Sequence, residues 1–130
     1  MERVYIFDTT LRDGGQTKGV DFSFADKIAI SEALDDLGID YIEGGWPGAN
    51  PTDDKLFGSP PKLKVSNFVA FGMTRRPNTS AANDPGLNAV LSGKSDSVCL
   101  VGKTWDFHVS KALNITLYEN IDMISESINE

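Results

Sequence analysis

Cysteine and histidine are almost absent from this chain, which has one of each in 130 residues. A single cysteine, Cys99, excludes an internal disulfide framework and is typical of a reducing compartment. Cys99 lies in the middle of an apolar run, so we expect it in the core rather than as a nucleophile. The single histidine, His108, cannot form a zinc site without cysteine or acidic partners, and we expect it to make a packing contact.

Positive charge and long apolar stretches are also scarce. The chain has 12 basic and 19 acidic residues, which gives a net charge of −7. Because an acidic protein is not attracted to nucleic acid or to an anionic membrane, we expect neither as a partner. No apolar run approaches the roughly 20 residues that cross a bilayer, and the first residues show no signal-peptide pattern. We therefore expect a cytoplasmic protein.

Glycine motifs for nucleotides are incomplete. Gly102-Lys103-Thr104 resembles the end of a phosphate-binding loop, but that motif requires glycine at position 97, which is a serine. The glycines at positions 14, 15 and 19 do not have the spacing of a dinucleotide fingerprint. Neither motif supports a nucleotide site.

The chain does contain a regular alternation of short apolar runs and helical patterns. Each apolar run is continuous, as expected of a strand that is covered on both faces. Strands that alternate with helices form a parallel sheet with right-handed crossovers. No linker divides the chain, so residues 1–130 are predicted to form a single α/β domain. The predicted strands are 4–7, 39–43, 67–71 and 97–101.

Capping residues mark where the helices begin and end. Ser23, with Asp26 three residues later, predicts a capping box, and Gly38 has the position of a glycine that ends a helix. Asn50 and Asp84 each precede a proline, which is favoured in the first helical turn. The last helix is predicted to begin at Thr116 with a second capping box. Its expected packing face is Tyr118, Ile121, Ile124 and Ile128.

Polar residues follow the first predicted strand directly, in the stretch from Asp8 to Gln16. Asp13 can offer a hard oxygen ligand to a divalent cation, beside the permanently charged donors of Arg12. The equally weighted alternative is an ordinary polar loop that carries a helix cap. Because the carboxyl ends of parallel strands share one edge of the sheet, ligands bind there in α/β folds.

The other strand ends carry polar and aromatic residues as well. Glu43 ends the second strand, and Arg75 and Arg76 follow the third. Paired arginines can hold a carboxylate or phosphate, which makes Arg75 a candidate for substrate binding, or they can be solvated or paired with acids. Trp46 and Trp105 lie in strand-end loops, where they line a pocket or cover the end of the sheet.

The run Asp8-Thr9-Thr10-Leu11-Arg12-Asp13-Gly14-Gly15-Gln16 resembles the first-strand signature of the metal-dependent TIM-barrel acyltransferases and lyases. That family includes isopropylmalate, homocitrate and citramalate synthases and hydroxymethylglutaryl-CoA lyase. The segments 41–51, 71–76 and 102–109 resemble its citramalate synthase branch. The resemblance covers essentially the whole chain.

The resemblance implies a function and a site. Asp13 would ligate a divalent metal (Mg, Mn or Zn), Arg12 would stabilise an enolate or keto-acid oxygen, and Gln16 and Glu43 would line the same site. The implied reaction condenses acetyl-CoA with pyruvate to give citramalate and free CoA, within branched-chain amino acid (isoleucine) biosynthesis. Glu43 would orient other groups or accept a proton through water.

The chain departs from the family pattern in two respects. The family completes its metal site with a His-x-His pair, which is absent here. A full barrel has eight βα units, and four are expected here, so the fold is predicted to be a parallel (βα)4 half of a TIM barrel. We expect this half to be inactive alone, to lack the metal, and to form homo-oligomers through its open edges. The alternatives are another 2-keto acid acceptor, as in isopropylmalate or homocitrate synthesis, or a non-catalytic interaction module.

Overall fold

The predicted apolar runs form one parallel sheet in the computed structural model, which describes residues 2–130. The strands lie in chain order, β1-β2-β3-β4, and every neighbouring pair is parallel. This order is the one that successive βα units of a barrel produce, and it confirms the predicted half-barrel topology. The strands are β1 Phe7–Asp8, β2 Tyr41–Gly45, β3 Asn67–Met73 and β4 Ser97–Val101.

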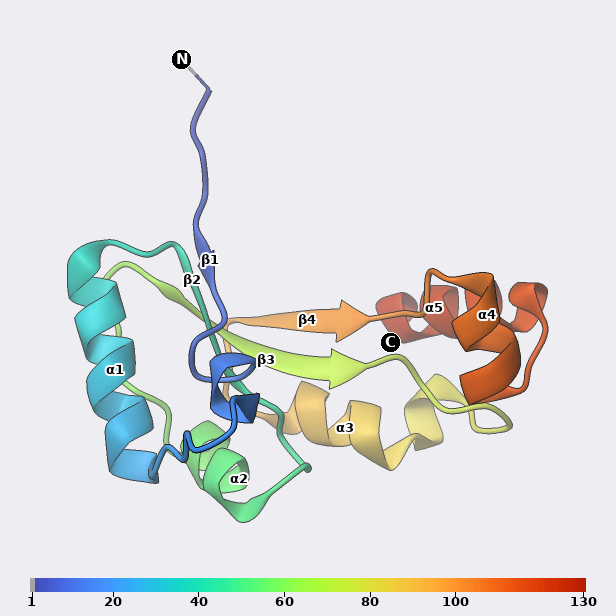
Figure 1. Cartoon of the computed structure of the whole chain (residues 1–130), viewed down its shortest axis with the longest axis horizontal. Helices are drawn as coiled ribbons and strands as arrows, with labels where there is room; N and C mark the ends of the chain where they lie inside the picture. Colours follow the sequence, from blue (N-terminus) through green and yellow to red (C-terminus); the bar gives the residue numbers. More distant parts are fainter. Residues whose placement is uncertain (1) are drawn as a thin grey trace.

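The helices alternate with these strands, and Figure 1 shows α1, α2 and α3 on one side of the sheet, with α4 and α5 beyond the ends of β3 and β4. The α-helices are α1 Phe24–Leu37, α2 Pro51–Gly58, α3 Pro85–Ser92, α4 Asp106–His108 and α5 Leu117–Asn129. The short 3-10 and π turns are η1 Gly14–Gln16, η2 Ala81–Asn83 and η3 Val109–Leu113.

The helix starts follow the predicted caps. The Ser23 hydroxyl accepts a hydrogen bond from the Asp26 backbone N–H, and the Asp26 carboxylate accepts one from the Ser23 N–H at 2.9 Å. At the other end of α1, Gly38 has φ +87°, a left-handed conformation that glycine adopts without strain. The Thr116 hydroxyl accepts a hydrogen bond from the Glu119 backbone N–H at 3.1 Å, which caps α5 with one half of the predicted capping box.

The main core lies between the sheet and the helices on its outer side. Ile42 and Phe68 of the sheet pack with Leu56 and Phe57 of α2, and all four side chains are buried. The rings of Phe57 and Phe68 are 5.1 Å apart. This core fixes β2 and β3, whose carboxyl ends carry the candidate site.

A carboxylate joins the opposite end of the sheet to α1. Asp35 accepts hydrogen bonds from the backbone N–H groups of Lys64, Val65 and Ser66 at 2.8 to 3.0 Å. The N–H groups of Lys64 and Val65 hold the pKa of Asp35 far below its usual range, against an opposing effect of burial. The loop that leads into β3 is therefore attached to the end of α1 through an ionised side chain.

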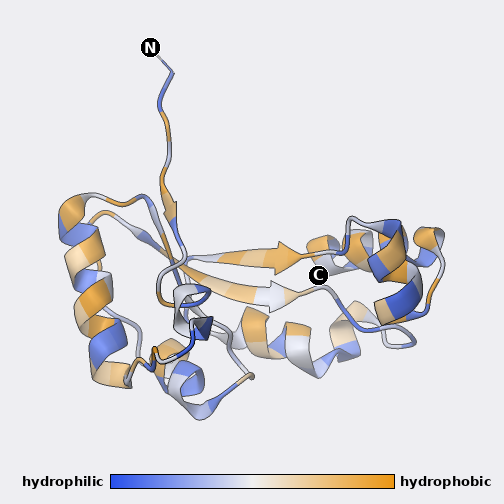
Figure 2. Cartoon of the chain, viewed as in Figure 1, coloured by the Kyte–Doolittle hydropathy of each residue, from blue (hydrophilic) through white to orange (hydrophobic). Residues whose placement is uncertain are grey.

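The first strand differs from the prediction. Only Phe7 and Asp8 form β1, and the preceding apolar residues are exposed, with Val4 83% exposed. The strand has β2 on one side, and no strand of the described residues pairs with its other edge. The run expected to be buried therefore lies open, and Figure 2 shows hydrophobic residues along this segment. The second strand begins two residues later than predicted, at Tyr41.

The packing face predicted for α5 was also wrong. Tyr118 is 83% exposed, and Ile121 and Ile128 are exposed as well. The helix instead buries Asn120, Met123 and Ser127 against the ends of the sheet. Among the predicted residues, Ile124 packs inward against Gly102, where a Cβ atom would lie 2.7 Å from its side chain. The apolar face faces solvent because no element of the described chain covers it.

No helix of residues 2–130 is long and apolar enough to span a bilayer.

Candidate functional site

The loop after β1 brings Arg12 to Glu43 at the end of β2. The carbonyl oxygen of Thr9 accepts hydrogen bonds from the backbone N–H groups of Arg12, Asp13 and Gly14, at 2.8 to 3.2 Å, which turns the loop tightly. Arg12 Nε then donates to Glu43 Oε2 at 2.7 Å. The Glu43 side chain is only 1% exposed, so the ion pair lies largely out of solvent.

Arg12 also contacts Asp13 and an aromatic ring. Its Nη1 donates to Asp13 Oδ1 at 3.1 Å, and its guanidinium carbon lies 4.0 Å from the centroid of the Phe71 ring. Trp46 contacts the same ring edge-on, with the centroids 5.2 Å apart. The face of an aromatic ring attracts a cation, so Phe71 and Glu43 together hold the guanidinium in place.

Cys99 lies beside this ion pair. Residues 43, 69, 71 and 99 share one face of the sheet, because Glu43 pairs with Val69 and Phe71 pairs with Cys99 in register. Burial raises the pKa of the Cys99 thiol, and the nearby Glu43 carboxylate raises it further. Cys99 is half-buried rather than fully in the core as expected, and its raised pKa favours the neutral thiol.

A hollow of about 240 Å³ adjoins Arg12. Gln16 lines it with Arg12, and Trp46 and Asn50 form the opposite wall. The structure therefore joins Arg12, Asp13 and Glu43 through direct contacts and places Gln16 around a space that Arg12 borders.

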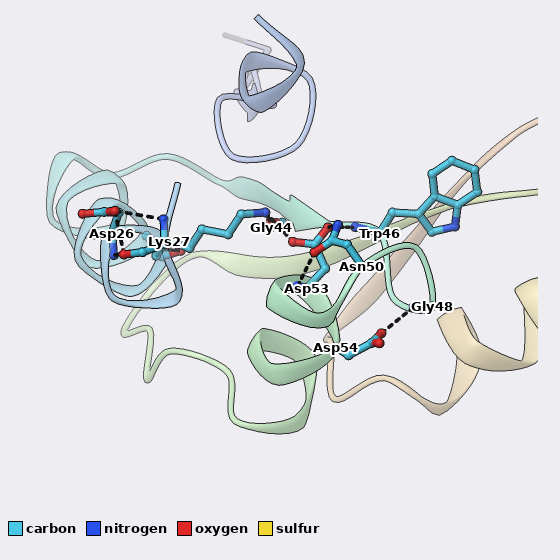
Figure 3. A network of polar contacts seen from close by, with 10 residues as sticks. Asp26, Lys27, Gly44, Trp46, Gly48, Asn50, Asp53 and Asp54 are labelled. Atoms are coloured by element: carbon cyan, nitrogen blue, oxygen red, sulfur yellow. Dashed lines mark hydrogen bonds and ion pairs between the residues drawn. The ribbon is translucent and has the colours of Figure 1, made fainter. Parts of the chain in front are cut away.

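The wall that carries Trp46 is held by a buried ion pair that the sequence did not indicate. Lys27 of α1 bonds to the carboxylate of Asp53 in α2 and donates to the Gly44 carbonyl oxygen at 2.9 Å. Asp53 Oδ2 in turn accepts from the Trp46 backbone N–H at 2.9 Å and from Asn50 Nδ2 at 3.0 Å. Figure 3 shows Lys27 reaching from α1 to this group.

Lys27 and Asp53 are 26 residues apart in the sequence. Charged residues on helices are mostly exposed to solvent, so the sequence alone predicts neither of them to be buried. One feature of the sequence could have indicated a role for Asp53. It is the third residue of the helix that begins after Asn50, and a carboxylate there can accept hydrogen bonds from backbone N–H groups. A Cβ atom at position 45 would lie 2.5 Å from the Asp53 carboxyl carbon, so Gly45 allows this close approach.

Arg75 lies against α5, away from Arg12. Its guanidinium forms an ion pair with Glu126 of α5, and its backbone N–H donates to the Ser127 hydroxyl at 2.9 Å. It lines a second hollow, together with Arg76 and Lys103. The structure therefore does not bring Arg75 into the hollow that Arg12 and Gln16 share.

The residues do not assemble a metal site within the described part of the chain. No group of three histidine, cysteine or acidic side chains suited to a metal ion occurs in residues 2–130. The Asp13 side chain is 62% exposed and contacts Arg12. His108 packs against Trp105, with the ring centroids 4.6 Å apart. Asp13 thus supplies one ligand at most within residues 2–130, and a divalent metal at this position would need further ligands.

Comparison with known proteins gives a consistent result. The model of the family described as HMGL-like matches residues 3–130. The chain is 51% identical over 129 residues to an (R)-citramalate synthase of Aquifex aeolicus, covering 98% of this chain and 24% of that protein. It is 45% identical to the (R)-citramalate synthase of Sulfolobus acidocaldarius, covering 97% of this chain and 24% of that protein. A 2-isopropylmalate synthase of Bradyrhizobium diazoefficiens is 34% identical, with 99% and 25% covered.

Solved structures with the same fold include two HMG-CoA lyases. The lyase of Brucella melitensis has a TM-score of 0.71 at 21% identity, covering 99% of this chain and 44% of that one. The lyase of Bacillus subtilis also has a TM-score of 0.71, at 22% identity, with 98% and 42% covered. These lyases are TIM barrels, so the four βα units correspond to half of a barrel. The chain spans about a quarter of the length of the curated relatives that it matches.

Proposed function

Because the chain belongs to the HMGL-like family, we propose that it is the N-terminal part of an acyltransferase that condenses acetyl-CoA with pyruvate to give (R)-citramalate and free CoA. The support is the identity of 44 to 51% to several (R)-citramalate synthases over nearly the whole chain. Since the chain spans only about a quarter of those proteins, the activity belongs to a longer polypeptide.

The observation that carries this proposal is the way in which Arg12 is held. Glu43 engages Nε, Asp13 engages Nη1, and Phe71 lies beneath the guanidinium, while the side chain keeps 19% exposure. No group among residues 2–130 bonds to Nη2, which is therefore open to an incoming substrate oxygen. A fixed cation in a largely dry site stabilises negative charge that develops on a keto-acid or enolate oxygen.

The neighbours of Arg12 have separate roles in this proposal. Glu43 keeps the guanidinium oriented, and in this proposal it accepts a proton through water. Gln16 offers amide donors and an acceptor to a substrate in the hollow that it shares with Arg12. Arg75 stays a prediction for substrate binding, and its pairing with Glu126 requires that contact to open first.

We also propose that Asp13 supplies one ligand to a divalent metal whose remaining ligands lie outside residues 1–130. Such a metal would polarise the keto group of the substrate. Among residues 2–130, the Asp13 carboxylate pairs with Arg12, and the side chain is 62% exposed. Cytoplasmic location remains the prediction from the single cysteine.

The decisive experiment is a chimera in which residues 1–130 replace the matching N-terminal segment of the Aquifex aeolicus enzyme. We expect CoA release that depends on pyruvate, followed with a thiol reagent. Arg12→Gln should lower kcat by about 10²- to 10³-fold, as the loss of one oxyanion donor does. Arg3→Gln is the matched control, because Arg3 pairs with Asp40 at the surface and should leave the rate unchanged.

Two other functions predict different results. Faster CoA release with 2-oxoisovalerate than with pyruvate would assign the chain to isopropylmalate synthesis, and faster release with 2-oxoglutarate would assign it to homocitrate synthesis. The similarity to a 2-isopropylmalate synthase is the reason to test these substrates. A folded chimera without activity towards any 2-keto acid would favour a non-catalytic half-barrel module. The 130-residue chain alone should release no CoA, and measurable release would contradict its expected inactivity.

A further inference from the structure

A second hollow of about 270 Å³ opens at the carboxyl ends of β3 and β4, apart from the hollow that Arg12 and Gln16 share. Its apolar lining includes Met73 and Leu87 from the β3 side and Leu113 and Met123 from the last third of the chain. Methionine side chains are flexible and polarisable, so such a lining adapts to short aliphatic groups. The volume of the hollow is near the lower limit for small-molecule sites, so we expect a ligand smaller than a typical drug molecule.

Cationic side chains also line this hollow. Arg75, Arg76 and Lys103 line it, in a chain whose net charge is −7. Arg75 is neutralised by its ion pair with Glu126. The side chain of Arg76 is mostly exposed, and Lys103 has no ion-pair partner among residues 2–130. Two cationic groups are therefore available to a ligand.

One acid of the lining opposes them. Asp84 accepts hydrogen bonds from the backbone N–H groups of Arg76 and Leu87 at 2.9 and 2.8 Å. Burial alone would raise the pKa of Asp84, but these N–H groups and the Arg76 charge hold it below its usual value, so the group stays ionised. Its charge offsets that of Arg76, whose Nε lies 4.0 Å away. The hollow is left with one positive charge in excess.

We propose that this hollow binds a small organic monocarboxylate with an aliphatic chain. The carboxylate lies between Arg76 and Lys103, and the chain lies among Met73, Leu87 and Met123. One excess positive charge matches one carboxylate, and the methionines match an aliphatic chain rather than a second polar group. The site is separate from that of Arg12 and Gln16, and Trp46 borders both hollows.

The chain offers a direct readout, because it has three methionines and two of them line the hollow. In protein labelled with ¹³C at the methionine methyl groups, titration with hexanoate should shift the Met73 and Met123 signals saturably. Hexanol, which keeps the chain without the charge, and acetate, which keeps the charge without the chain, should each bind about tenfold more weakly or worse.

Variants test the charged part of the proposal. Lys103→Gln and Arg76→Gln should each raise the Kd for hexanoate by about tenfold. Lys111→Gln is the matched control, because Lys111 is exposed and does not line the hollow, and it should leave the Kd unchanged. Unchanged amide spectra elsewhere would show that each variant is folded.

Three results would overturn the proposal. One is a linear, unsaturated drift of the Met73 and Met123 methyl signals with hexanoate. A second is hexanol binding as tightly as hexanoate, which would mean an apolar space without anion recognition. The third is an unchanged Kd in both the Lys103 and Arg76 variants. None of these results depends on whether the chimera condenses acetyl-CoA with pyruvate, so the two proposals fail separately.

Discussion

The side chain of Arg12 is restricted to few conformations by its neighbours. Glu43 fixes one edge of the guanidinium, Asp13 another, and Phe71 its lower face. Trp46 supports the Phe71 ring from the side. A long, flexible side chain normally loses conformational entropy when it binds a ligand. Here the folded chain has ordered it already, which is the property a transition-state donor requires.

Phe71→Leu tests this arrangement at the residue scale. The change removes the cation–π contact with Arg12 and the edge contact with Trp46, each worth roughly 0.5–2 kcal/mol. We expect the free energy of unfolding to fall by about 1–3 kcal/mol, measured by urea denaturation. In a Trp105→Phe background, the emission of Trp46 should also shift to the red.

Phe107→Leu is the control for this change, because Phe107 is exposed and its ring contacts Trp105 rather than Arg12. It should cost less than about 0.5 kcal/mol. If both substitutions had equal effects, Phe71 would have no special role beneath the guanidinium.

At the scale of elements, buried carboxylates join parts of the chain that are distant in sequence. Asp53 connects α1, through Lys27, to the loop that follows β2. Asp35 connects the end of α1 to the loop before β3. The first contact supports the wall of the Arg12 hollow, and the second holds the opposite end of the same sheet. Each carboxylate acts as a fixed acceptor for backbone N–H groups that no strand or helix satisfies.

Asp35 makes stability depend on pH in a predictable direction. Its pKa is far lower in the folded chain than in the unfolded chain, where about 3.9 is usual. Its contribution is therefore complete above the unfolded pKa and is lost as the pH falls towards the folded pKa. Asp35→Asn should lower the Tm at pH 7, and the difference from the parent chain should shrink as the pH falls below about 4.

Asp36→Asn is the neighbouring control, because Asp36 pairs with Lys64 in an exposed position. Its effect on the Tm should be small at every pH. A constant difference between Asp35→Asn and the parent chain from neutral to acid pH would show that the charge of Asp35 does not contribute.

At the scale of the whole molecule, the half barrel leaves apolar surface open that a closed barrel would cover. The run from Val4 to Phe7 is exposed beside β1, and Val98 and Val101 are exposed on β4. The apolar face of α5 is a third exposed region. Unpaired strand edges are templates for another strand, so we propose that the 130-residue chain self-associates through β1 and β4.

Light scattering after gel filtration tests this association. We expect the parent chain to form dimers or larger species as concentration rises, and the double variant Ile6→Lys with Val98→Lys to remain a monomer, because edge lysines block strand pairing. Tyr118→Lys on α5 is the control and should not change the assembly. A parent chain that is monomeric at all concentrations would contradict the proposal, and dissociation by Tyr118→Lys would move the interface to α5.

The order of elements and the strand-end position of the site could be predicted, because they follow from local patterns. Caps such as Ser23 and Asp84 are recognisable within four residues, Glu43 ends a predicted strand, and Arg12 lies in the loop that follows another. The Lys27–Asp53 pair could not be predicted, because it depends on how two helices pack. The exposure of Val4 and Tyr118 could not be predicted either, because an apolar pattern shows which face can be covered and not what covers it.

The close approach of Gly44 to Phe68 limits which substitutions the chain can accept at these two positions. A Cβ atom at position 44 would lie 2.2 Å from the ring of Phe68, which is buried in the main core. A side chain at position 44 is therefore excluded while the phenylalanine is present. Replacement of Phe68 by a smaller residue opens a cavity, which alone is unfavourable but removes the clash. A side chain at position 44 therefore requires a smaller residue at position 68, and relatives that lack glycine at 44 should also lack phenylalanine at 68.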